Sequence, residues 1–70
     1  MVPLPFAAPG EETLIRRIGG SPETKKHLED LGFVVGGSVT VINAVAGNLI
    51  VKVKEGRVAL NRDLAAKIMV

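Results

Sequence analysis

The residues of this chain that could bind a metal ion lie together in one short stretch. Glu23, His27 and Asp30 are spaced by four and then three residues, so on an α-helix their side chains would share one face. Two carboxylates and an imidazole at this spacing could hold a divalent ion that prefers oxygen and nitrogen ligands. The same spacing arises by chance on any helix rich in charge. These three residues are therefore kept as candidates only, and we predict no resident metal and no cofactor.

The side chains needed for nucleophilic catalysis are scarce. The chain has one histidine, no cysteine and no tyrosine. A catalytic triad would have to combine Ser21 or Ser38 with His27 and a carboxylate, and nothing in their spacing supports it. Gly19, Gly20 and Ser21 precede a predicted helix and could hold an anion at its N-terminus, but without the lysine of a phosphate-binding loop they fit plain helix capping better. We predict that the protein is not an enzyme.

The basic residues raise a third function, contact with nucleic-acid phosphates. Lys52, Lys54 and Arg57 lie close together, the net charge is +2 and the isoelectric point is about 9.4. Seven acidic residues are interspersed among the nine basic ones, and Phe6 and Phe33 are the only aromatic residues. Nucleic-acid-binding surfaces concentrate their positive charge and often use exposed rings. Solvated strand faces explain these lysines better, so no nucleic-acid partner is expected.

The composition is that of one small folded domain. Of the 70 residues, 47% are hydrophobic and 23% charged. A chain of this size buries only about 60–65% of the surface that it exposes when unfolded, so it forms a single core. The absence of cysteine favours a cytoplasmic location. The start, MVPLPFAAPGEE, has no signal-peptide pattern, and no apolar run is long enough to span a membrane. We therefore expect one domain over residues 1–70, without direct membrane insertion.

The clearest element in the sequence is a helix over about residues 22–31. Ser21 is a suitable N-cap, and a proline follows at the first helical position. Gly32 would leave the helix in the left-handed conformation, and Phe33 would then pack back on Leu28. Few apolar residues mark this helix, so it is expected to lie on the surface.

The other segments predict short antiparallel strands. Residues 1–10 are expected to be extended, with a turn at their end. The expected strands cover residues 12–18, 38–45, 49–54, 57–60 and 67–70, with tight turns at 46–48 and 55–56 and a short helical turn at about 61–66. Alternation would place Val39, Val41 and Val45 on the buried face and Lys52 and Lys54 outside. This pattern indicates a small, partly closed antiparallel barrel.

The order of these motifs resembles the FeoA family, the small cytosolic proteins that accompany the bacterial ferrous-iron transporter FeoB. The stretches LIRRIGG, HLEDLGFVVGGSVTVI and NLIVKVKEGRVALNRDLAAKIMV follow the family pattern. That pattern has an arginine-bearing strand, a helix ending in Leu-x-x-Leu-Gly, an alternating strand, a hairpin and a closing ALxxxxAxxIxV. One departure is clear, because the usual Pro-Gly turn is replaced by Val35 and Gly36, followed by Gly37. Without the proline, a looser turn is expected.

The resemblance implies a mainly β, SH3-like barrel of about five strands with one inserted helix. It also implies a non-enzymatic accessory or regulatory protein of ferrous-iron uptake that binds the cytosolic domain of FeoB. Two alternatives remain, a metal-responsive sensor domain and an SH3-like nucleic-acid-binding module. The free edges of such a small sheet leave a monomer or a weak homo-oligomer as the expected state.

We expect the partner-binding surface on the helix and the loop that follows it. Glu29 and Asp30 occupy the last helical turn, where acids oppose the helix dipole, and apolar residues come directly after them. A small core does not bury every apolar residue, and exposed ones often mark interfaces. The predicted contact residues are Lys25, Lys26, Glu29, Asp30, Phe33 and Val35.

Overall fold

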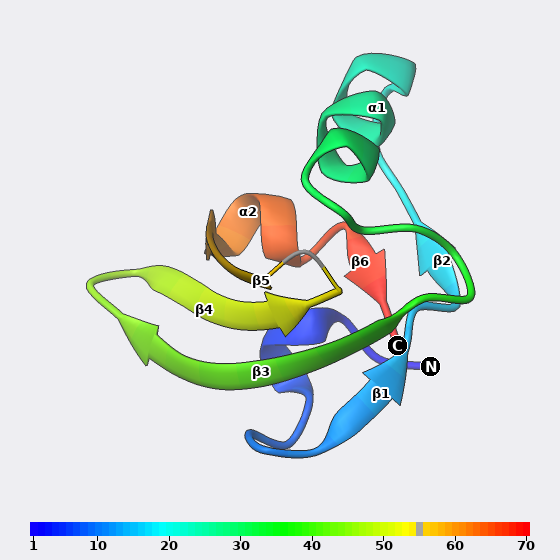
Figure 1. Cartoon of the computed structure of the whole chain (residues 1–70). Coiled ribbons are helices and arrows are strands. Elements are labelled where there is room, and N and C mark those ends of the chain that lie inside the picture. Colours follow the sequence, from blue (N-terminus) through cyan, green and yellow to red (C-terminus); the bar gives the residue numbers. More distant parts are fainter. Residues whose placement is uncertain (55) are drawn as a thin grey trace.

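The structure is a computed structural model that describes residues 1–54 and 56–70 (Figure 1). Its elements in chain order are η1 (Leu4–Phe6), β1 (Glu12–Leu14), β2 (Arg17–Ile18), α1 (Pro22–Asp30), β3 (Ser38–Val45), β4 (Asn48–Val53), β5 (Gly56–Asn61), α2 (Arg62–Ala65) and β6 (Ile68–Met69). The predicted mainly β fold, with one inserted helix and a short helical turn, is confirmed. No helix in the described part of the chain is long and apolar enough to cross a bilayer.

The strands form two antiparallel sheets around one core. The larger sheet has the order β1-β3-β4-β5, and the smaller one pairs β2 with β6. The other side of β6 is taken by the start of the chain, where Val2 and Val70 exchange backbone hydrogen bonds of 2.9 and 2.8 Å. Both ends of the chain therefore lie side by side next to β1 (Figure 1).

The expectation of one continuous strand over residues 12–18 is wrong. The N–H of Ile15 donates to the loop before β3, whereas the N–H of Arg16 donates to the carbonyl of Met69 on β6, both at 2.8 Å. Arg16 and the residue after it both face Met69, the arrangement of a β-bulge, and the chain changes sheet there. As a result Ile15 is buried, whereas Leu14 is 53% exposed.

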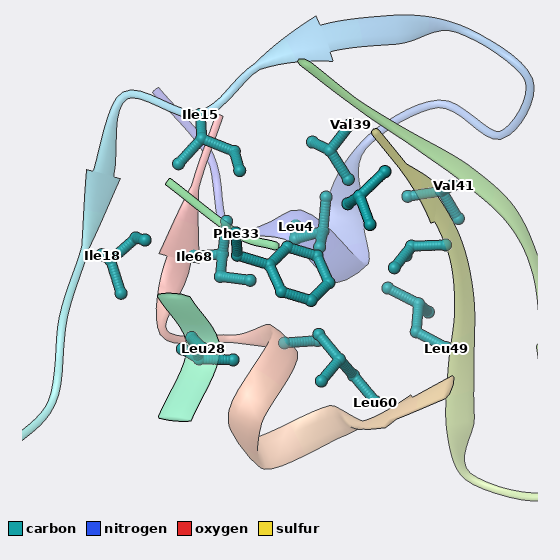
Figure 2. Close-up of a cluster of buried hydrophobic side chains, with 13 residues drawn as sticks. Leu4, Ile15, Ile18, Leu28, Phe33, Val39, Val41, Leu49, Leu60 and Ile68 are labelled. Carbon is teal, nitrogen blue, oxygen red and sulfur yellow. The ribbon is translucent and has the colours of Figure 1, made fainter. Parts of the chain in front are cut away.

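Helix α1 begins and ends as the sequence predicts. The hydroxyl of Ser21 accepts a hydrogen bond of 3.2 Å from the backbone of the first turn. At the other end Gly32 has a φ of 104°, its N–H donates to the carbonyl of Glu29, and the N–H of Phe33 donates to that of Leu28, both at 2.9 Å. These two bonds define a Schellman motif. The apolar contact that accompanies it joins Leu28 and Phe33, both fully buried (Figure 2).

The loop from α1 to β3 makes backbone hydrogen bonds to Ile15 and within itself. The N–H of Gly36 donates to the carbonyl of Ile15 at 2.7 Å, and the N–H of Ile15 donates to the carbonyl of Gly37 at 2.8 Å. The N–H of Gly37 also donates to the carbonyl of Val34 at 2.9 Å. A Cβ atom at Gly37 would lie 3.1 Å from Val34, so this second glycine allows the close turn.

The strands after this loop follow the predicted alternation until a register shift. Val39 and Val41 are buried, but between Val41 and Asn43 the pairing with β4 slips by one residue. Because each slip reverses the two faces of a strand, Val45 is 52% exposed instead of facing the core. The turn at Ala46 is confirmed by the pairing of the strands on both sides of it. The second hairpin is confirmed by the pairing of β4 with β5, while Glu55, which was predicted in its turn, lies outside the described residues.

The core consists of apolar side chains from both sheets, both α-helices and η1 (Figure 2). They are Leu4, Ile15, Ile18, Leu28, Phe33, Val39, Val41, Leu49, Val51, Val53, Leu60, Ala65 and Ile68. Leu4 was not foreseen, because residues 1–10 were expected to be extended. Instead η1 forms one 3₁₀ turn with Pro3 at its N-cap and Pro5 in its first turn, and this turn directs Leu4 into the core.

Replacing Leu4 should therefore reveal its contribution to stability. Leu4→Ala removes a fully buried side chain and should lower the free energy of unfolding by about 2–5 kcal/mol. Phe6→Ala, in the same turn but at an exposed position, is the matched control and should change it by less than about 0.5 kcal/mol. Urea unfolding followed by circular dichroism measures both. Equal effects of the two changes would show that η1 is not anchored by Leu4.

Candidate functional site

A groove opens between the C-terminal end of α1 and the outer face of the larger sheet. Its volume is about 890 Å³, and we call it the helix-end groove. Its charged lining residues are Glu12, Glu29, Asp30, Lys52 and Lys54. Val34, which is exposed, and the neighbouring glycines of the loop complete one rim.

The sheet supplies the floor of the groove through strand register. Glu12 on β1 pairs with Thr40 on β3, and Thr40 pairs with Lys52 on β4. Side chains of paired residues lie on the same face, so these three form one row across the sheet. Val39 and Val51, one residue before Thr40 and Lys52, face the core. The alternation that fills the core thus also directs a polar row to the outside.

The end of α1 supplies a wall of negative charge. Glu29 and Asp30 are exposed in its last turn, close to the negative end of the helix dipole. Lys52 on β4 and Lys54, one residue beyond its end, are also exposed and line the same groove. The two sides of the groove therefore carry opposite charge and both remain open to solvent. Such a surface can bind a segment that presents a cation to the helix end and a carboxylate to β4.

Most of the predicted contact residues are exposed, but they do not all border the groove. Glu29 and Asp30 line it, whereas Lys25 and Lys26 lie one turn earlier on α1. Each lysine lies four positions before one of the acids, so the lysines continue the same helix faces. Val35 is exposed in the loop beside the groove.

Phe33 has to be removed from the predicted surface. Its side chain is 0% exposed and lies in the centre of the core (Figure 2). The Schellman motif turns this residue inward, because its ring is the apolar partner of Leu28. Val34, which the sequence interpretation did not include, is exposed in its place. The ring of Phe33 therefore positions the groove and does not line it.

The candidate metal ligands are not brought together. Glu23, His27 and Asp30 are all exposed on α1. Among residues 1–54 and 56–70, no three histidine, aspartate or glutamate side chains form a group that could hold a metal ion. The other small motif, Gly19 to Ser21, acts as a helix cap, because the Ser21 hydroxyl accepts the first-turn N–H.

The basic residues proposed for phosphate contact are divided between two surroundings. Lys52 and Arg57 are register partners on neighbouring strands, so their side chains lie together on the outer face of the sheet. Lys52 and Lys54, however, share the groove with three carboxylates. A phosphate backbone would meet repulsion on one side of this groove, so its mixed charge suits a protein segment better.

No local pattern in the sequence indicates that the acids of α1 share a groove with Lys52 and Lys54. They are more than twenty positions apart in the sequence and were assigned to different hypotheses. Their approach depends on the loop from α1 to β3 and on the pairing of β3 with β4. A local sequence pattern cannot show that residues so far apart in the chain are close in space.

The sequence model of the FeoA domain matches residues 2–70. The chain belongs to the FeoA family. This FeoA chain is 36% identical over 70 residues to a protein of Methanocaldococcus jannaschii named "Putative Fe(2+) transport protein A", a match that covers 100% of this chain and 85% of the relative. The family associates the chain with ferrous-iron transport, as an accessory protein.

Solved FeoA structures share the fold. A crystal structure of an iron uptake regulatory protein (FeoA) superimposes with a TM-score of 0.89 and 29% identity, covering 99% of this chain and 92% of that one. The FeoA of Stenotrophomonas maltophilia, solved in complex with zinc and described as an SH3 domain protein, gives a TM-score of 0.80 at 22% identity, covering 96% and 86%. The SH3-like fold expected for this FeoA chain is thereby confirmed.

We expect the negative charge at the end of α1 to lower the stability of the free protein. Replacing Glu29 with Gln and Asp30 with Asn should raise the free energy of unfolding by about 1 kcal/mol at low salt, because exposed acids oppose the helix dipole. Glu11→Gln, an exposed acid outside any helix or strand, should leave it unchanged. Urea unfolding at low and high salt provides the measurement, and the gain should shrink as salt screens the charges. Loss of stability in the double variant would show that the acids make favourable contacts already.

Proposed function

We propose that this FeoA protein is a non-enzymatic regulator of ferrous-iron uptake that acts in the cytoplasm and binds the cytosolic domain of a FeoB-type transporter. Membership of the FeoA family supports the link to ferrous-iron transport. The proposed location of the binding surface rests on the helix-end groove, where Glu29 and Asp30 lie at the end of α1 and Lys52 and Lys54 lie at the end of β4.

In this proposal the groove binds an extended segment of the transporter domain. A basic side chain of that segment approaches Glu29 and Asp30, where it also offsets the unfavourable position of these acids at the helix end. An acidic side chain approaches Lys52 and Lys54. The charges orient the bound segment and speed its association, because complementary charged surfaces steer the encounter of two proteins more than they raise the affinity.

The apolar rim supplies the remaining affinity. Val34 and Val35 are exposed next to the charged groove, in a chain whose other valines mostly face the core. Apolar contacts surrounded by polar ones are typical of the centre of a protein interface. Binding here can change the activity of the transporter only if the segment is more accessible in one of its states.

Charge reversal on each side of the groove tests the surface. The double variants Glu29→Lys with Asp30→Lys, and Lys52→Glu with Lys54→Glu, should each weaken binding to the purified transporter domain by about tenfold or more, equivalent to about 1.4 kcal/mol. Isothermal titration calorimetry measures the affinity. The matched controls are Glu11→Lys and Arg62→Glu, which are exposed and lie outside the groove.

The possible outcomes distinguish an error in the proposed partner from an error in the proposed binding surface. If the wild-type protein does not bind the transporter domain at any concentration, the proposed function is wrong. If it binds and both groove variants bind equally well, the partner is right and the groove is the wrong surface. Weakening by the groove variants, with both controls unchanged, supports the whole proposal.

A further inference from the structure

A second surface lies at the edge of β5, which ends the larger sheet on the side opposite β1 (Figure 1). The carbonyl of Val41 accepts a 2.8 Å hydrogen bond on its β1 side, so its register partner Val51 directs its backbone groups away from β3 and toward β5. Val51 pairs in turn with Val58 of β5. Because backbone groups alternate along a strand, those of Arg57 and Ala59 point away from the sheet.

The middle of this edge is open to solvent. Within residues 1–54 and 56–70, no group bonds to the outward N–H and C=O groups of Arg57 and Ala59, and both residues are exposed. α2 begins after Asn61 and buries Ala65 in the core, so it covers only the end of β5. An open strand edge of this kind can pair with an added strand.

The charge of the edge indicates what kind of strand it fits. Arg57 lies on the outer face beside its register partner Lys52, and Arg62 directly follows β5. Residues 56–62 include no acid. Two copies joined through this edge would bring like charges together, whereas a carboxylate opposite Arg57 is favourable. The charge therefore favours an acidic segment over a second copy of this chain.

The small side chain of Ala59 adds a requirement of size. Its register partner Ile50 is half-buried on the same outer face, so a large apolar side chain opposite Ala59 would pack on both residues. In antiparallel pairing, the residue opposite Arg57 comes two positions after the residue opposite Ala59. The edge therefore fits a segment in which an acidic residue follows an apolar one at a distance of two positions.

We propose that the edge of β5 binds an extended acidic peptide segment, which adds an antiparallel strand to the larger sheet. The outward groups of Arg57 and Ala59 bond to the backbone of the segment, the Arg57 side chain pairs with its carboxylate, and its apolar residue covers Ala59. This contact is smaller than the roughly 1,200 Å² of a stable interface, so binding is weak and reversible. Residues 56–61 are not among those that line the helix-end groove, so this surface is additional to the proposed function.

A synthetic peptide tests the proposal with the purified chain alone. The probe is a blocked peptide of glutamate, threonine, isoleucine, valine, glutamate and threonine in this order, whose isoleucine meets Ala59 and whose second glutamate meets Arg57. At a peptide concentration of about ten times Kd, hydrogen exchange of the Arg57 and Ala59 amides should slow roughly tenfold, because only the unbound fraction exchanges. The amides of Val58 and Leu60, which face β4, should not change and serve as internal controls in the same NMR spectra.

Matched changes in the peptide and in the chain distinguish strand pairing from simple charge attraction. N-methylation of the isoleucine removes an N–H that faces Ala59 and should abolish binding, whereas N-methylation of the valine, whose N–H faces solvent, should preserve most of it. Arg57→Glu should weaken binding at least about tenfold. Arg17→Glu, at an exposed position of β2, is the matched control and should not weaken it.

Several results would contradict the proposal. It fails if the peptide at about 1 mM leaves the exchange of Arg57 and Ala59 unchanged, if the two N-methylated peptides bind equally, or if Arg57→Glu and Arg17→Glu have the same effect. If a short single-stranded oligonucleotide binds as tightly as the peptide, the edge is only a basic patch and the proposal is wrong. The transporter domain takes no part in these measurements, so failure here is distinguishable from failure of the proposed function.

Discussion

The N–H groups of Gly32 and Phe33 bond to carbonyls in the last turn of α1, while the Phe33 ring fills the centre of the core. We call this turn from the helix into the loop, residues 28–33, the helix-end corner. It fixes where the helix stops and where the following loop begins. The loop is then held to Ile15, at the point where the chain passes from β1 to β2. The direction of α1, the start of β3 and the switch between the sheets thus depend on one buried ring and a few backbone bonds.

The helix-end corner also explains how a chain with a small hydrophobic core can hold a surface groove in place. The residues that turn inward, Leu28 and Phe33, alternate with residues that turn outward, Glu29, Asp30 and Val34. The inward set holds the helix end in place, and the outward set forms one side of the helix-end groove. A change that loosened the corner would therefore alter the groove without replacing any of the residues that line it.

The free edge of β5 shows a second consequence of small size. A sheet with so few strands keeps an edge open, and in this chain that edge is short and bears the exposed Arg57. Short edge strands with charged residues normally limit association. On β1, at the other end of the sheet, Glu12 borders both the groove and the hollow beside the paired chain ends.

The sequence by itself determined the elements whose signals are local. Ser21 and Gly32 mark the ends of α1, Asn61 caps α2 through a 2.8 Å hydrogen bond, and the order of these motifs is that of the FeoA family. Only the tertiary structure decided the burial of Leu4, the change of sheet after Ile15, the outward turn of Val45 and the meeting of acids and lysines in one groove. The physical reason is that caps and turns depend on neighbouring residues, whereas strand register, bulges and the facing of distant charges depend on pairings between segments far apart in the chain.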